Sequence, residues 1–184
     1  TAGRGAFSNV RQARIAKTLR LLDDREAFMA DLVRDIASLV KQAARRGLTP
    51  AVRLNGTSDL PWERMPLVHN GQRYASLMVL FPDVQFYDYT KWPYEKRNKL
   101  PANYDLTYSL AEGADRMEEA TRNLANGRNV AVVFRTAYAP GGSYLNHDVI
   151  NGDEDDARFL DASPVVIGLK AKGKARKDTS GFVK

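Results

Sequence analysis

Cysteine is missing from this chain of 184 residues, and histidine occurs at only two positions. Without thiols, the chain itself cannot form disulfides, zinc–thiolate sites or cysteine-ligated iron–sulfur clusters. Two histidines are too few for a metal site built from several imidazoles. No apolar run approaches the roughly 18 residues that a membrane-spanning helix needs, so we expect no membrane partner and a cytoplasmic location.

The composition is that of a globular protein. Hydrophobic residues make up 43% of the chain and charged residues 27%, which is enough apolar material for a buried core. The length suits one domain, and we expect residues 1–184 to form a single α/β domain. Because the chain begins at Thr1 rather than methionine, this domain can also be the C-terminal part of a longer polypeptide.

Positive charge is concentrated at the two ends of the chain, whose overall net charge is +6. Residues 1–20 contain Lys and Arg but no acid, and residues 168–184 contain a single acid, Asp178, among their Lys and Arg residues. Such basic termini predict contact with a polyanion, and nucleic acid is the first candidate partner. The alternative is that the basic termini are solvated and keep the protein soluble.

Hydrophobic periodicity predicts strands that alternate with helices. Helical spacing of apolar residues predicts helices over residues 8–22, 25–46, 74–81 and 115–126. Short apolar runs predict strands over residues 51–54, 84–87, 104–108, 130–134 and 165–169, and residues 137–151 are predicted to form the longest loop. This pattern indicates an α/β fold with a mainly parallel sheet, flanking helices and two N-terminal helices.

Polar residues follow several of the predicted strands. In parallel α/β folds the carboxyl ends of the strands share one edge, and ligands bind there. We therefore expect these side chains to converge: Asn55, Ser58, Asp59, Asp88, Lys91, Ser109 and Lys170. Asp59 and Asp88 suit acid–base catalysis or a divalent cation such as Mg²⁺ or Mn²⁺, and Lys91 suits a phosphate or a developing oxyanion. The alternative is that both aspartates cap the helices that follow.

Two further segments are candidates for ligand contact. Asp153 and Asp156 belong to a dense acidic cluster that can hold Mg²⁺ or Mn²⁺, although acids are also favoured at a solvated helix N-terminus. Tyr89 and Trp92 lie in an aromatic stretch that precedes several cations, a pattern that can stack bases, although aromatic residues also anchor ordinary loops. Lys172, together with Lys170, is expected to bind phosphate.

Five segments together resemble a known family. They are residues 52–59 (VRLNGTSD), 82–91 (PDVQFYDYTK), 103–109 (NYDLTYS), 151–161 (NGDEDDARFLD) and 168–174 (GLKAKGK). The chain resembles, over residues 1–184, the uncharacterised phage and plasmid family called gene product eighty-eight. That family is distantly similar to radical-SAM-type (β/α) barrels with a cysteine-bearing segment, so the resemblance implies a partial or irregular barrel. This chain departs from that pattern because it has no cysteine.

These observations lead to one preferred hypothesis and two alternatives. The preferred hypothesis is a phage- or plasmid-type protein that binds, and processes, a phosphorylated or nucleic-acid substrate at the carboxyl edge of a parallel sheet. The first alternative is a non-catalytic module that binds nucleic acid or an acidic protein. The second is an iron–sulfur enzyme whose cysteine-bearing segment lies upstream of Thr1.

Overall fold

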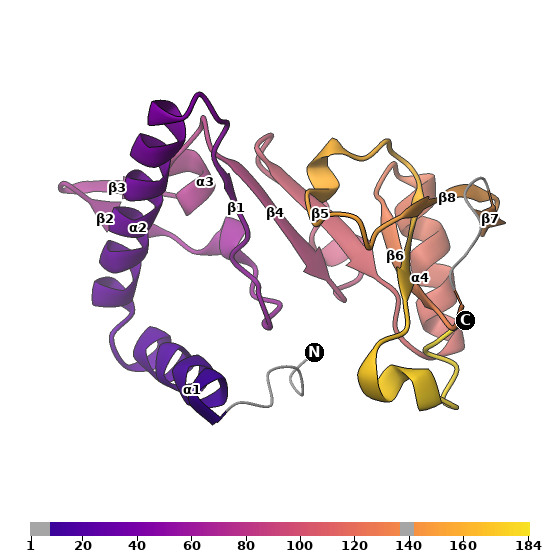
Figure 1. Ribbon diagram of the computed structural model, residues 1–184. Coiled ribbons are helices and arrows are strands. Elements are labelled where there is room, and N and C mark those ends of the chain that lie inside the picture. Colours follow the sequence, from indigo (N-terminus) through magenta and orange to yellow (C-terminus); the bar gives the residue numbers. More distant parts are fainter. Residues whose placement is uncertain (1–7, 137–141) are drawn as a thin grey trace. The chain divides into compact units, whose positions relative to one another are not determined.

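The protein is described by a computed structural model that covers residues 8–136 and 142–184 (Figure 1). The chain divides into two compact units, residues 1–86 and residues 87–184, which are described in turn. The division falls within strand β4 (Gln85–Thr90).

Two helices open the first unit, as the periodicity predicts: α1 (Ser8–Asp23) and α2 (Arg25–Arg45). Asp24 separates them, and its carboxylate accepts a hydrogen bond of 3.1 Å from the backbone N–H of Ala27. This N-cap satisfies one of the donors that every helix leaves unpaired at its start. α2 ends before Gly47, whose φ of +63° is the left-handed conformation that glycine adopts easily.

α2 buries a stripe that agrees only in part with the sequence pattern. The helical spacing predicts one apolar stripe of Phe28, Leu32, Ile36, Leu39, Val40 and Ala43, of which Ile36 and Ala43 are buried, whereas Leu39 is 36% exposed. The buried residues at helical spacing are Met29, Val33, Ile36 and Ala43. The predicted and observed faces share Ile36 and Ala43, and they differ because Met29 and Val33 are buried in place of Phe28 and Leu32.

The rest of the first unit contains short elements. They are β1 (Ala51–Val52), the 3-10 helix η1 (Trp62–Arg64), β2 (Leu67–His69), β3 (Gln72–Tyr74) and α3 (Leu77–Leu80). β2 and β3 form a hairpin whose turn, Asn70–Gly71, has positive φ at both residues. The predicted helix over residues 74–81 is therefore too long: the strand occupies its start, and Ser76 caps a single helical turn.

One sheet of seven strands includes β1 and β4 and runs in the order β1-β4-β5-β6-β9-β8-β7. Its other members are β5 (Tyr104–Ser109), β6 (Val130–Phe134), β7 (Ser143–Tyr144), β8 (His147–Asn151) and β9 (Val166–Lys170). β6 pairs in parallel with β5 and β9, β9 pairs in parallel with β8, and β7 is antiparallel to β8. The mainly parallel sheet is as predicted, but within the described residues the strand order is linear and the predicted barrel is not seen.

The second unit has apolar side chains on both faces of its sheet. Helix α4 (Ala114–Ala125) lies against one face, where Leu124 packs with the strand residues Tyr108, Val130 and Val166 (Figure 1). On the other face, Ala131, Val165 and Ile167 form a smaller cluster. Short 3-10 helices complete this unit: η2 (Tyr94–Lys96), η3 (Arg158–Leu160) and η4 (Gly173–Lys177). This two-sided burial explains why β6 reads as a continuous apolar run.

The predicted loop over residues 137–151 is partly wrong. Residues 137–141 lie outside the described part of the chain, whereas β7 and β8 occupy residues 143–151 as a hairpin. Leu145 and Asn146 form its turn with positive φ values. β8 then continues the sheet by pairing in parallel with β9. Among the described residues, no helix has both the length and the apolar character to cross a membrane.

We expect Gly152→Ala to destabilise the second unit. A Cβ atom at this position would lie 2.3 Å from Cγ2 of Ile167 and 2.9 Å from Cδ2 of Leu169. Overpacking of this kind costs about 1–3 kcal/mol. Gly56→Ala is the matched control, because nothing lies within 4 Å of the Cβ it would add. Urea unfolding measures both variants, and equal stability of the two would contradict the close packing around Gly152.

Candidate functional site

The carboxyl ends of the parallel strands in the second unit meet at one edge of the sheet. The last pair of the β6–β9 ladder joins Phe134 to Lys170, and Arg135 and Ala171 follow this pair out of the sheet. On the other side of β9, Asn151 pairs with Gly168 and leads into the acidic segment. Ser109 pairs with Ala131, three residues before the end of β6, and so lies further inside the sheet than Lys170.

The last residues of the chain are fixed at this edge by backbone hydrogen bonds. The N–H of Ala171 donates to the carbonyl of Phe134 at 2.8 Å. Val183 forms a parallel bridge with Val133, where the N–H of Lys184 donates to the carbonyl of Val133 at 2.9 Å. The N–H of Arg135 donates in turn to the carbonyl of Lys184 at 2.7 Å. Residues 171–184 therefore leave β9 and return to the end of β6.

The guanidinium group of Arg135 holds the middle of this segment. Its Nη1 donates to the carbonyl of Arg176 at 3.2 Å, and its Nη2 donates to the carbonyl of Asp178 at 2.9 Å. Lys91 reaches the same segment, with its Nζ 5.5 Å from the centroid of the Phe182 ring. We call this region the basic edge and define it by its cations: Lys91, Arg135, Lys170, Lys172, Lys174, Arg176, Lys177 and Lys184.

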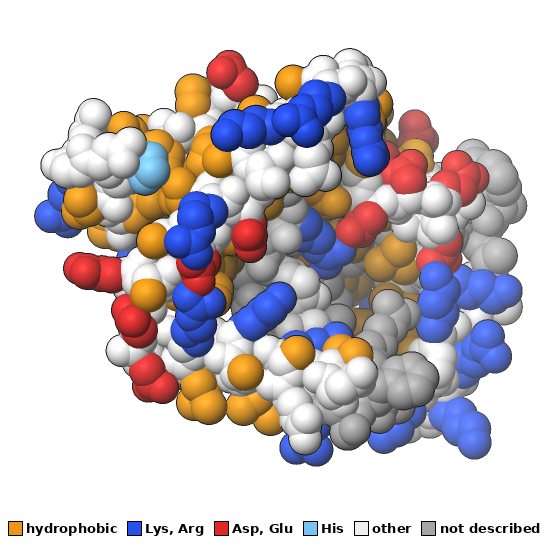
Figure 2. Space-filling view, turned by 60° about the vertical axis from the view of Figure 1, so that its left-hand side comes forward, with side chains coloured by type: hydrophobic (Ala, Val, Ile, Leu, Met, Phe, Trp, Pro, Cys, Tyr) orange, Lys and Arg blue, Asp and Glu red, His pale blue; other side chains and the backbone are white. Residues whose placement is uncertain are grey.

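Two acidic residues, Asp153 and Asp178, lie within the basic edge, and each accepts hydrogen bonds from neighbouring residues. Asp153 accepts hydrogen bonds from the backbone N–H of Lys170 at 2.8 Å and from Nζ of Lys172 at 2.5 Å. Asp178 accepts from the Ser180 hydroxyl and the backbone N–H of Val183, and the Ser180 hydroxyl is the main cause that lowers the pKa of Asp178. The remaining cations give the edge an excess of positive charge. Several groups of Lys and Arg side chains are visible on the face shown in Figure 2.

Asp88, predicted as a catalytic or metal-binding residue, is buried in a polar network of the second unit. Its side chain is 1% exposed, and its Oδ2 accepts a hydrogen bond of 3.0 Å from the Tyr104 hydroxyl. Nη2 of Arg97 donates to the same hydroxyl at 3.1 Å, and Nη1 of Arg97 is 3.3 Å from the Thr90 hydroxyl. Burial, followed by the charge of Asp88, raises the pKa of Tyr104, so this phenol stays neutral and donates to the carboxylate.

Asn55 organises a loop of the first unit. It is 3% exposed, and its Oδ1 accepts from the Ser58 hydroxyl, the Leu60 N–H and the Trp62 indole N–H at 2.8–3.0 Å. Its Nδ2 donates to the Leu60 carbonyl. Asn55, Ser58 and Asp59 belong to the first unit, whereas the other residues of the predicted site belong to the second. The convergence of these two groups stays a prediction.

The remaining predicted ligand contacts lie in the second unit. Trp92 is 37% exposed next to Lys91, and the Tyr89 hydroxyl lies 3.3 Å from Oδ1 of Asp156. Asp156 thus contacts a tyrosine, while Asp153 contacts Lys172. In the described residues, no three His, Cys, Asp or Glu side chains are grouped closely enough to hold a metal ion. The metal-binding role of these aspartates stays a prediction.

Comparison with known proteins establishes the family. The family model described as Gene product 88 matches residues 1–184. The chain belongs to the gene product 88 family. Searches of curated proteins and of solved structures found no match. Family membership agrees with the predicted phage-type character, whereas the expected likeness to radical-SAM-type barrels has no support.

Several buried charges of this family member were missed by sequence reasoning. Arg97 and Arg158 are at most 1% exposed, and Arg158 forms ion pairs with Asp155 at 2.9 Å and Asp161 at 3.3 Å. Glu119, within α4, accepts from the backbone N–H of Tyr94 at 2.5 Å. Charged side chains are normally exposed, so their positions in the sequence gave no signal of burial.

Two carboxyl groups of the second unit have altered acidity: Asp105, near the start of β5, and Asp161, at the end of η3. Burial raises the pKa of Asp105, and the nearby charge of Arg128 partly opposes this shift. Burial also raises the pKa of Asp161. One oxygen of Asp105, Oδ1, is buried without a hydrogen-bond donor. This region therefore disfavours the charged form of Asp105.

Asp105→Asn is expected to raise the urea midpoint at pH 7. The unfolded chain ionises near the usual pKa of about 3.9, whereas the folded protein holds the proton to higher pH, so stability falls as pH rises above about 4. The asparagine side chain of the variant does not ionise, so it adds no such pH dependence to the stability. The advantage of the variant should shrink as pH falls toward 4 and below, because Asp105 then becomes protonated in the unfolded state as well. Asp35→Asn, at an exposed position of α2, is the control. A variant advantage that stays constant with pH would contradict this assignment.

Proposed function

We propose that this phage-type protein binds nucleic acid in the cytoplasm, through the phosphate backbone, at the basic edge of its second unit. The observation that carries the proposal is the attachment of residues 171–184 to the end of β6. Backbone bonds at Val133 and Arg135 fix the cations of this segment on a sheet edge. A fixed array loses less conformational entropy on binding than a loose basic tail.

The chemistry of the basic edge suits phosphate groups. Lys172, Lys174, Arg176 and Lys177 are exposed, and they follow one another within six residues. Arg135 uses its guanidinium group to hold two backbone carbonyls, so its contribution is to position the segment. Phosphate contacts of this kind are independent of base sequence, and they weaken as salt rises because counterions are released on binding.

An aromatic side chain next to Lys91 supports single-stranded nucleic acid as the substrate class. Trp92 is partly exposed next to Lys91, and its backbone N–H is fixed by the Thr90 hydroxyl at 3.0 Å. Lys91 in turn contacts Phe182 of the C-terminal segment. Single-strand binding proteins commonly combine a positive groove with aromatic rings on which bases stack.

Processing of the bound substrate is a further part of the hypothesis. It would require Asp59, Asp88 and Lys91, with Mg²⁺ or Mn²⁺ held by Asp59 and Asp88 or by Asp153 and Asp156. Lys91 lies at the basic edge, whereas Asp88 is enclosed by Tyr104 and its neighbours. The iron–sulfur alternative requires cysteines outside the printed sequence. Binding is thus the part of the function that the described contacts support best.

The salt dependence of oligonucleotide binding tests the proposal. We expect the combined variant Lys174→Gln, Arg176→Gln and Lys177→Gln to bind a single-stranded oligonucleotide more weakly. The slope of log K against log salt should fall in magnitude by about 0.7 for each phosphate contact removed, and so by about 2 if all three are lost. Fluorescence anisotropy at several salt concentrations measures both quantities.

The control removes the same charge from the other unit. Lys41→Gln, Arg45→Gln and Arg46→Gln change three exposed residues at the end of α2. This variant should keep the wild-type slope if the basic edge is the binding site. Equal slopes for both triple variants, or no binding by the wild-type protein at low salt, would refute the proposal.

A further inference from the structure

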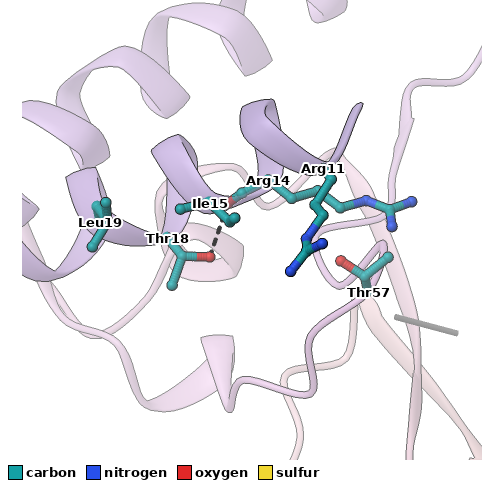
Figure 3. A pocket seen from close by; sticks show the side chains of 6 residues that line it. All are labelled: Arg11, Arg14, Ile15, Thr18, Leu19 and Thr57. Carbon is teal, nitrogen blue, oxygen red and sulfur yellow. Dashed lines mark hydrogen bonds between the residues drawn. The ribbon is translucent and has the colours of Figure 1, made fainter. Parts of the chain in front are cut away.

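A groove of about 300 Å³ lies along α1 in the first unit (Figure 3). Its lining combines three kinds of side chain: guanidinium groups, hydroxyl groups and branched apolar groups. The lining residues are Arg11, Arg14, Ile15, Thr18, Leu19 and Thr57. Five of the six come from α1, at spacings of three or four residues that place them on neighbouring rows of the helix surface. Thr57, from the loop that Asn55 organises, closes the other side.

The apolar residues of α1 are unusually exposed. Ile15, Leu19 and Leu22 follow the spacing of a buried helical face, yet they are 49%, 51% and 73% exposed. An amphipathic helix normally buries such a stripe. Water is therefore in contact with apolar surface that a suitable ligand could cover, and covering it would be favourable.

The arginines of α1 lie at two places. Arg20 forms an ion pair with Asp31 of α2, and Asp31 also pairs with Arg34, so Arg20 helps to join the two helices. Arg11 and Arg14 line the groove, and their side chains extend on the side where Thr57 lies (Figure 3). Thr18 keeps its hydroxyl bonded to the backbone carbonyl of Arg14 at 3.0 Å. The groove thus presents positive charge immediately beside Ile15 and Leu19.

We propose that this groove binds an acidic, amphipathic segment of a partner protein. Carboxylates of such a segment would pair with Arg11, because a guanidinium group matches a carboxylate in a two-bond geometry, and Arg14 would add positive charge beside it. Leucine-type side chains of the segment would cover Ile15 and Leu19. This is the helix-in-groove mode of recognition, with the partner selected by charge complementarity.

Two other polyanions fit the groove less well. A nucleic-acid backbone would satisfy the arginines but would leave Ile15 and Leu19 in water. An anionic membrane suits a basic amphipathic helix whose apolar face carries Trp, Phe or Leu, and α1 has leucines but no aromatic residue. The groove is also walled by Thr57, which suits an inserted segment better than a flat bilayer.

A synthetic helical peptide of 18 residues with Glu and Leu on one face is the probe, and anisotropy with the full chain is the measurement. Arg11→Gln and Leu19→Gln should each weaken binding at least fivefold. Two matched controls on the same helix, Lys17→Gln and Leu22→Gln, change exposed residues outside the groove lining and should change binding less than twofold. All four changes are at exposed positions, and circular dichroism verifies that the variants keep their helix content.

Further measurements identify the kind of ligand that binds in the groove. A peptide with Lys in place of each Glu should not bind, and oligonucleotide affinity should be the same for Leu19→Gln and wild type. Equal losses in the test and control variants, or no peptide binding, would overturn the proposal. So would binding to vesicles of phosphatidylserine and phosphatidylcholine that depends on Leu19 while the Glu peptide fails to bind. The proposal does not rest on nucleic-acid binding by the second unit, because the two assays use different residues.

Discussion

The parallel ladder between β6 and β9 is the interaction on which the second unit depends. Five consecutive residue pairs, from Val130–Val166 to Phe134–Lys170, fix the register of these strands. A shift of one residue would exchange the two faces of β6 and turn Val130 and Val132 away from the core that they form with α4. The same register pairs Phe134 with Lys170, so that Arg135 follows directly at the edge of the sheet, where the backbone of Val133 pairs with the end of the chain. The β6–β9 register therefore contributes both to the fold of the second unit and to the position of the basic edge.

Buried charge is the second constraint in this unit. Arg97 is enclosed beside Thr90 and Tyr104, while Arg128 lies with its guanidinium carbon 4.7 Å from the centroid of the Tyr94 ring and donates to the Arg97 carbonyl at 2.7 Å. Removing charges from water is costly unless hydrogen bonds replace the hydration shell. These bonds link η2, β4, β5 and the start of β6, which gives the network a role in fixing the segments around the sheet.

The sequence predicted most of the regular elements because their signals are local. Apolar residues at helical spacing place α1, α2 and α4 within one or two residues of their observed bounds, and apolar runs place β5, β6 and β9 equally well. The β2–β3 hairpin was missed although Asn70–Gly71 is a strong hairpin signal, because the apolar residues around 74–81 also fit a helix. β8 was missed because its sequence, HDVIN, contains only two apolar residues and so forms no apolar run of the kind that marks β6.

The predicted site illustrates the same limit. Asp88 was expected just beyond a strand ending at Tyr87, but β4 continues to Thr90, so Asp88 lies on the buried face of the strand. Lys91 and Lys170 were expected at a sheet edge, and both contribute to the basic edge. No local pattern marks Arg135, since its role depends on carbonyls more than 40 residues away. Strand ends and long-range backbone contacts decide such positions, and a single sequence carries little information about either.

Chemical acetylation of lysines, with and without a bound oligonucleotide, tests the central claim most directly. Mass spectrometry after limited reaction reports the reactivity of each lysine. Binding at the basic edge predicts that Lys172, Lys174 and Lys177 become protected, while Lys41, exposed on α2, keeps its reactivity. Equal protection of Lys41 and the three basic-edge lysines, or protection of Lys41 alone, would contradict the account.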